Sequence, residues 1–173
     1  MTAKNVLQIP KTSPAKRTAS IAVFTALSVV GSFIHPPSPI QTVAFDSCPG
    51  FFSALYFGVF EGFLVSGLGH IVTAVINGFP LGILHIPIAL GMALAGAAIG
   101  VVNRISRKWG FMPALIIGVL INTALFVVAA PDPPIGIGWA AALSFAPFLL
   151  IAAILNAVVA GVAYVLIRGR QRV

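Results

Sequence analysis

The chain has 173 residues, of which 59% are apolar and only 8% charged. Its mean hydropathy is +1.07. Soluble domains carry about 25% charged residues, so this composition excludes a soluble globular protein and indicates an integral membrane protein.

A net charge of +7 would also suit a nucleic-acid-binding protein, but the positions of the charges argue against one. The ten basic residues lie between or outside the apolar runs, which is the pattern of basic residues kept on the cytoplasmic side of a membrane. We therefore expect no nucleic-acid partner. These residues are Lys4, Lys11, Lys16, Arg17, Arg104, Arg107, Lys108, Arg168, Arg170 and Arg172.

The chain divides into a basic cytoplasmic segment (1–17), a membrane domain (18–167) and a basic cytoplasmic tail (168–173). A membrane-spanning helix needs about 20 residues. The runs 18–34, 83–103 and 111–130 each fit one crossing, and 49–76 and 140–167 are overlong. In the last run we place Pro147 in the first turn, where proline is tolerated, which predicts one helix from about Ser144 to Ile167.

The run 49–76 decides the topology. If it forms two helices with a break near Gly58–Glu61, every basic residue lies on the cytoplasmic side. Glu61 then sits at the inner turn, and not at the bilayer centre, where a carboxylate is costly. The first helix, from Pro49 to about Phe57, is too short to span the membrane alone. The prediction is an all-α bundle of six helices with one short second helix and both termini cytoplasmic.

The segment GVFEGFLVSGLGH follows this break. Gly62 and Ser66, with Gly69, form a stripe of small residues that lets another helix approach closely. His70 continues the same side of the helix, and we expect it to make an internal hydrogen bond before any contact with a ligand.

The connections 35–48, 77–82 and 131–138 lie on the outer side in this topology and are rich in proline and glycine. Such shaped loops over the mouth of a bundle can form a binding site or a lid. The candidate ligand-binding residues are the polar and aromatic side chains in or near these loops and the two asparagines within the apolar runs: Gln41, Asp46, Asn77, His85, Asn122, Trp139 and Asn156.

Several of these candidates also have a structural interpretation. Asp46 or Ser47 can cap the helix that begins near Pro49. Asn77, followed by glycine, is a good helix stop, and Trp139 suits a membrane interface. The asparagines within the apolar runs can form hydrogen bonds between helices.

Enzyme motifs are not convincing. We find no P-loop, no H-E-x-x-H and no nucleophile elbow, and we expect no catalytic residue, metal site or cofactor. Cys48 is the only cysteine, so no internal disulfide forms. Any ATP-driven work must then fall to partner chains. The alternatives are a self-sufficient small channel or facilitator, and a membrane enzyme or assembly subunit.

The combination of an alanine motif near the start, the segment FDSCPGFFSALYFG and the glycine-rich segment resembles the substrate-binding S component of energy-coupling factor vitamin transporters. The resemblance implies a membrane-embedded binding subunit for a vitamin or vitamin precursor in a prokaryotic cytoplasmic membrane. It also implies a transmembrane coupling subunit and two cytoplasmic ATPases as partners, besides membrane lipid. By the same resemblance, Ala22 and Ala26, with Ala19, face the coupling subunit.

Many relatives carry an acidic residue where this chain has His70, which leaves the role of this histidine open. The loop FPLGILH (79–85) is similar to the branch proposed to take up the cobamide precursor α-ribazole. Cobalamin and pantothenate, pyridoxine-type or thiamine-type compounds remain open as ligands.

Overall fold

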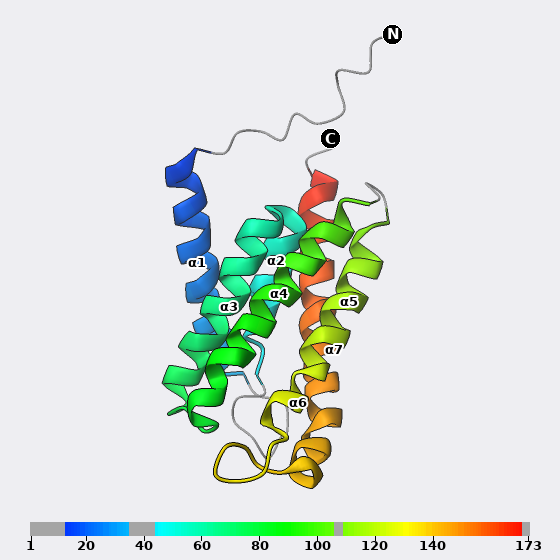
Figure 1. Ribbon diagram of the computed structural model, residues 1–173. Helices are drawn as coiled ribbons and strands as arrows, with labels where there is room; N and C mark the ends of the chain where they lie inside the picture. The colour runs from blue at the N-terminus through cyan, green and yellow to red at the C-terminus, as the bar shows by residue number, and fades with distance from the viewer. Residues whose placement is uncertain (1–12, 35–43, 106–108, 171–173) are drawn as a thin grey trace.

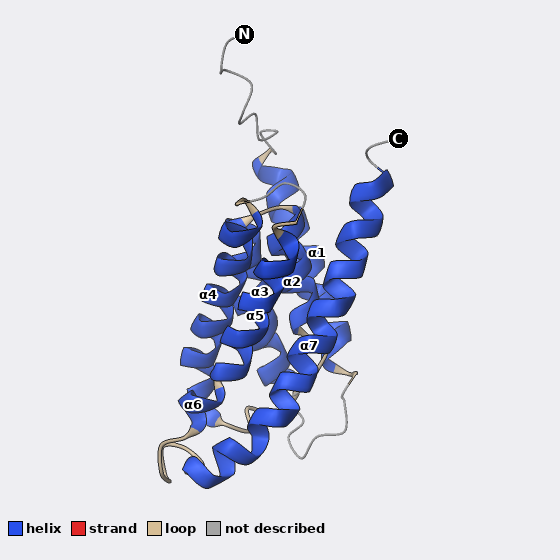
Figure 2. Cartoon of the chain, turned by 90° about the vertical axis from the view of Figure 1, so that its right-hand side faces the viewer, coloured by secondary structure: helices blue, strands red, loops and turns tan. Residues whose placement is uncertain are grey.

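The computed structural model describes residues 13–34, 44–105 and 109–170, and all the regular secondary structure in these ranges is helical (Figures 1 and 2). The elements in chain order are α1 (Pro14–Ser32), α2 (Ser47–Tyr56), α3 (Val59–Ile76), the 3-10 helix η2 (Gly82–Leu84), α4 (His85–Asn103), α5 (Phe111–Ala124), α6 (Phe126–Ala129) and α7 (Trp139–Arg170). Because only Leu125 separates α5 from α6, these two make one span, and the predicted all-α fold of six helices is confirmed.

Four helical segments of the described chain are long and apolar enough to cross a membrane. They are Val59–Ile76, Gly82–Asn103, Phe111–Ala129 and Trp139–Arg168. The helix α1 has 19 residues but carries Lys16 and Arg17 in its first turns, which lowers its hydropathy. The helix α2 has only 10 residues and, as predicted, is too short to span alone.

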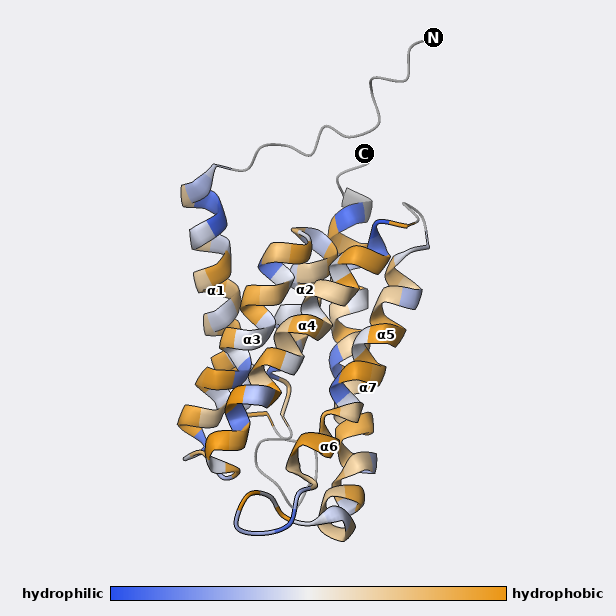
Figure 3. Ribbon diagram, viewed as in Figure 1, coloured by the Kyte–Doolittle hydropathy of each residue, from blue (hydrophilic) through white to orange (hydrophobic). Residues whose placement is uncertain are grey.

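The two ends of the bundle differ in character. At the terminal end, defined by Arg17, Glu61, Arg104 and Arg168, lie the start of α1, the end of α7 and the α4–α5 connection (Figure 1). At the opposite loop end lie the connections 77–84 and 130–138. Polar colours gather at the terminal end and in the α6–α7 loop, while apolar colours dominate the sides of the helices (Figure 3).

The break between α2 and α3 falls at Phe57 and Gly58, where the sequence predicts it. Gly58 has φ +123°, a conformation that glycine adopts without steric cost, and its N–H donates to the Ser53 carbonyl at 3.1 Å. Asn103 of α4 donates to the Leu55 carbonyl at 2.9 Å and so satisfies the last turn of α2. The corner is therefore held by backbone and side-chain hydrogen bonds together.

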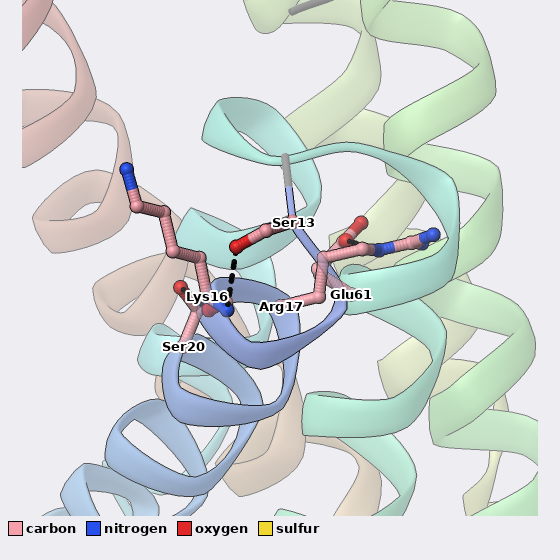
Figure 4. Close-up of polar contacts among 5 residues, drawn as sticks. All are labelled: Ser13, Lys16, Arg17, Ser20 and Glu61. Carbon is pink, nitrogen blue, oxygen red and sulfur yellow. Dashed lines mark hydrogen bonds and ion pairs between the residues drawn. The ribbon is translucent and has the colours of Figure 1, made fainter. Parts of the chain in front are cut away.

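Glu61 lies in the first turn of α3 and is buried, with 7% of its surface exposed. Nε of Arg17 donates to its carboxylate at 2.7 Å (Figure 4). The Arg17 guanidinium also lies over the Phe60 ring, 4.6 Å from its centroid. This ion pair attaches the terminal end of α1 to α3.

The stripe of small residues on α3 packs as predicted. A Cβ atom on Gly62 would collide with Ala54 of α2 and with the backbone of Gly96 in α4. A Cβ atom on Gly69 would come within 2.7 Å of the Ser28 hydroxyl of α1. Three helices thus approach α3 more closely than larger side chains allow.

Two helix boundaries differ from the predictions. The first helix begins at Pro14 and not near residue 18, because Ser13 accepts a hydrogen bond from the Lys16 N–H and proline suits the first helical position. The last helix begins at Trp139, so Pro147 lies inside it and not in its first turn. Its ring removes one hydrogen bond there, but the surrounding apolar residues continue the helix on both sides.

Candidate functional site

A cavity of about 80 Å³ lies between α3, α4, α5, α6 and α7, and its lining includes the first residues of α4 and α7 at the loop end. Most of its wall is apolar, including Met92, Phe126 and Phe145. Six polar residues also border it, and they come from five helices and the segment before α2: Asp46, Ser47, His70, His85, Asn122 and Asn156. An apolar cavity with a few convergent polar groups is the usual form of a small-molecule site.

Asp46 stands at the N-cap position of α2, yet its side chain makes no capping hydrogen bond. It is 7% exposed, and its carboxylate accepts a hydrogen bond from the Ser47 hydroxyl at 3.2 Å. Burial raises the pKa of Asp46 to about 6, against the opposing effect of the Thr73 and Ser47 hydroxyls and the nearby backbone N–H groups. The chain has no lysine or arginine between Arg17 and Arg104. Within the described residues, Asp46 therefore has no basic partner.

Asn156, and not Asp46, caps the start of α2. Its side-chain oxygen accepts a hydrogen bond from the Cys48 N–H at 2.6 Å, in the first turn of α2. Its amide nitrogen donates to the carbonyls of Ala44 and Ala152 at 3.0 and 2.9 Å. Since these contacts use its oxygen and both of its N–H groups, Asn156 fixes the start of α2 against α7 and has no donor left for a ligand.

The two histidines that border the cavity are hydrogen-bonded to each other, with His70 Nε2 3.1 Å from His85 Nδ1. The Leu81 N–H donates to His85 Nε2 at 3.3 Å, so this nitrogen carries no proton. Neutral His85 then holds its proton on Nδ1 and donates it to His70 Nε2, which places the proton of His70 on Nδ1. Among the described residues, His70 Nδ1 is the one ring nitrogen of the pair without a partner.

The expected internal hydrogen bond of His70 is thus confirmed, and the same residue also reaches the cavity. His85 is fully buried, and both of its ring nitrogens are engaged within the protein. The pairing across the α3–α4 connection is not visible in the sequence, where the two histidines are 15 residues apart.

Asn122 borders the cavity from α5, and its amide nitrogen lies 3.4 Å from the Ser47 hydroxyl. Ser47, which the sequence presents only as a possible cap, therefore links Asn122 to Asp46. We find no signal in the sequence that would have assigned it this place.

The remaining predicted ligand-binding residues do not meet at the cavity. Asn77 follows the end of α3 and donates to the Thr73 carbonyl at 2.9 Å, which is the helix-stop interpretation. Trp139 is 55% exposed and does not border the cavity. Gln41 lies outside the described residues.

The alanines that the resemblance assigns to a docking face lie on α1. Ala19, Ala22 and Ala26 are all exposed in the isolated chain. Val23, Leu27 and Val30 of the same helix are exposed as well. This helix therefore has an apolar surface of small and medium side chains that the chain itself leaves uncovered.

A comparison with protein families agrees with this architecture. The family model for the substrate-specific component of ECF transporters matches residues 16–167, which include most of α1 and all of α2 to α6. No curated protein and no solved structure matches the chain. The match covers well over half of the chain, and the chain belongs to the family of ECF transporter substrate-specific components, which are membrane-embedded, non-enzymatic binding subunits that work with a coupling subunit and ATPases.

Proposed function

We propose that this chain captures a vitamin or vitamin precursor in the cavity at the loop end. The observation that carries the proposal is the position of the polar groups. Asp46, His70 and Asn122 converge on one apolar cavity, while the described basic residues lie at the opposite end of the bundle. Asn156 and His85 position this site, because their hydrogen-bonding groups are used within the protein.

The same distribution of charge supports a topology with both termini in the cytoplasm of a prokaryotic cell and the loop end outside. A cysteine that replaces Asp132, in a Cys48→Ser background, is then expected to react with an impermeant maleimide in intact cells. A cysteine that replaces Arg104 should react only after the cells are opened. The reverse pattern would refute this orientation.

The first ligand to test is α-ribazole, because the segment 79–85 is similar to the branch proposed to bind this compound. Ligand pockets usually measure roughly 300–1,000 Å³, whereas the cavity has about 80 Å³. A single ring is closer to this size than a whole nucleoside. Binding of a whole vitamin therefore requires a movement of neighbouring segments, among them the α6–α7 loop, whose Ile137 borders the cavity.

The exposed alanines of α1 support a docking role for this helix. Residues with small side chains let a second membrane helix approach closely, and Ala19, Ala22 and Ala26 are uncovered in the chain alone. We assign this face to the coupling subunit, through which the two ATPases drive release of the ligand to the inside.

Affinity purification from native membranes tests the proposal directly. We expect a coupling subunit and ATPases to co-purify, and mass spectrometry to detect a vitamin-like compound bound to the chain. Recovery of neither, with no vitamin bound at micromolar concentration, would overturn the proposed function. Solute flux into liposomes by the chain alone would support a facilitator in its place.

The docking face has its own test. In the double variant Ala22→Leu and Ala26→Leu, bulky side chains should prevent the close approach and remove the coupling subunit from the purified complex, with ligand retention unchanged. Ala124→Leu places the same side chain at an exposed site on α5 and should have no such effect. Retention of the coupling subunit by the double variant would show that it docks elsewhere.

A further inference from the structure

The described polar groups of the cavity suit a hydrogen-bond donor and do not suit an anion. We infer that the ligand of this site is cationic or neutral and donates hydrogen bonds to Asp46, and that the site rejects compounds that carry a phosphate or carboxylate there. This inference rests on the proposed function and adds to it a chemical class of substrate.

The first argument is the absence of a positive charge to receive an anion. Asp46 is buried and borders the cavity, and its partners among the described residues are hydroxyls and backbone N–H groups, of which the Ser47 hydroxyl lies at 3.2 Å. The chain contains no lysine or arginine from residue 18 to residue 103 or from 109 to 167. The described basic side chains, such as Arg17 and Arg168, lie at the other end of the bundle. A buried carboxylate without a cation is costly, and a ligand that supplies the charge or a donor relieves that cost.

The second argument concerns the start of α2, which would otherwise attract an anion through its free N–H groups. The Cys48 N–H donates a hydrogen bond to the side-chain oxygen of Asn156, and Pro49 has no N–H. The N–H of Ser47 lies beside the Asp46 carboxylate and lowers its pKa. The helix terminus is therefore already matched with protein oxygens and offers no free site to a phosphate.

The third argument is the direction of the remaining hydrogen bonds. Asn122 donates towards Ser47, and Ser47 donates to Asp46, so this chain of donors ends at the carboxylate. On the other side of the cavity His70 offers only one N–H, because its Nε2 accepts from His85. One neutral imidazole N–H is too weak a donor to hold an anion beside the Asp46 carboxylate, because the two negative charges repel each other.

Three compounds with the same ring and different charge test this class without knowledge of the natural ligand: benzamidinium, benzamide and benzoate at pH 7.4. Each is titrated by ligand-observed NMR against the purified full chain in phosphatidylcholine nanodiscs, with empty nanodiscs as the blank. We expect benzamidinium to bind most tightly and benzoate most weakly, with at least about a tenfold difference in Kd between them. Equal binding of the three, preferential binding of benzoate, or binding of none would overturn the inference.

The matched variants are Asp46→Asn and Asp132→Asn. Both remove one aspartate charge, but Asp132 lies in the exposed α6–α7 loop and does not border the cavity. Asp46→Asn should reduce the Kd difference between benzoate and benzamidinium to less than about threefold, while Asp132→Asn should keep it. An unchanged difference in Asp46→Asn would refute the role of this carboxylate.

Natural compounds extend the test to whole ligands and separate it from the proposed function. We expect α-ribazole and thiamine to bind more tightly than their monophosphates. If the purified protein retains an anionic vitamin and the coupling subunit, the proposed function stands and the inference fails. If the three probes bind with the expected order of affinities but neither a vitamin nor a coupling subunit is recovered, the charge preference stands and the proposed function fails.

Discussion

Glu61 and Asp46 are equally buried, each 7% exposed, but their surroundings differ. Glu61, at the terminal end, meets Arg17 at 2.7 Å and takes part in an ion pair that joins two helices. Asp46, beside the cavity, has no basic partner among the described residues, and the Ser47 hydroxyl donates to it at 3.2 Å. A buried carboxylate that is paired within the protein has a structural role, whereas one that is left facing a cavity needs its partner from outside.

The same distinction separates two asparagines that both border the cavity. Asn156 has its oxygen and both N–H groups engaged with the backbone, while Asn122 makes one long contact of 3.4 Å to Ser47. Position in the lining of a cavity is therefore not enough to assign a ligand contact. The unused hydrogen-bonding capacity of each side chain is the better guide.

The greatest loss of stability is expected for Asn156→Ala. This variant leaves the Cys48 N–H and the Ala44 carbonyl without their side-chain partner inside the protein. We expect the free energy of unfolding to fall by about 3 kcal/mol. Asn122→Ala should cost less than about 1 kcal/mol, because its one hydrogen bond to the described residues, 3.4 Å to Ser47, is long. Denaturant unfolding of both variants in the same detergent checks this difference, and equal losses would contradict it.

Removal of the cation from the paired carboxylate should have the next largest effect. Arg17→Ala leaves the buried Glu61 without a partner, but the Arg17 side chain is 42% exposed and solvent screens part of the interaction. We expect a loss of about 2 kcal/mol in the free energy of unfolding. Lys16→Ala, at an exposed neighbour, should change it by less than about 0.5 kcal/mol. A similar loss in both variants would show that the ion pair contributes little.

Neutralising the two carboxylates should change stability in opposite directions. In the ligand-free protein, Asp46→Asn removes an unpaired buried charge and should raise the free energy of unfolding by about 1 kcal/mol. Glu61→Gln removes a paired charge and should lower it. Thermal unfolding of the two ligand-free variants, side by side with the unmodified protein, measures the signs. A loss of stability in Asp46→Asn would mean that its charge is compensated within the protein.

The last prediction concerns the dependence of stability on pH. Burial raises the pKa of Asp46 to about 6, so the folded protein takes up a proton more readily than the unfolded chain. The folded state should therefore gain stability relative to Asp46→Asn as the pH falls from about 7 to 5, and lose it as the pH rises through the folded pKa. His70 and His85 are present in both proteins, so the difference between the two unfolding curves reports Asp46. Parallel curves would contradict this assignment.

Much of the fold could be predicted because it follows from local sequence. The two-helix solution for 49–76 rests on where basic residues may lie, and the structure places the break at Phe57 and Gly58. The stripe of Gly62, Ser66 and Gly69 follows from their spacing of four and three residues, which places them on one side of a helix. The start of the last helix could not be predicted in this way, since Pro147 suggests a first turn and yet lies eight residues inside α7.

Hydropathy and charge along the chain were sufficient to predict the membrane character, the number of helices and the grouping of the described basic residues at one end of the bundle. Each of these depends on the cost of placing a residue type in lipid. The roles of the polar residues required the packed structure. Asp46 is left without its capping bond because Asn156, 108 positions after Cys48, accepts that N–H. His70 meets His85 because the α3–α4 connection folds the two helices side by side. Hydrogen bonds between distant segments leave no periodic pattern in the sequence, so only the packed structure distinguishes a satisfied polar side chain from one that awaits a ligand.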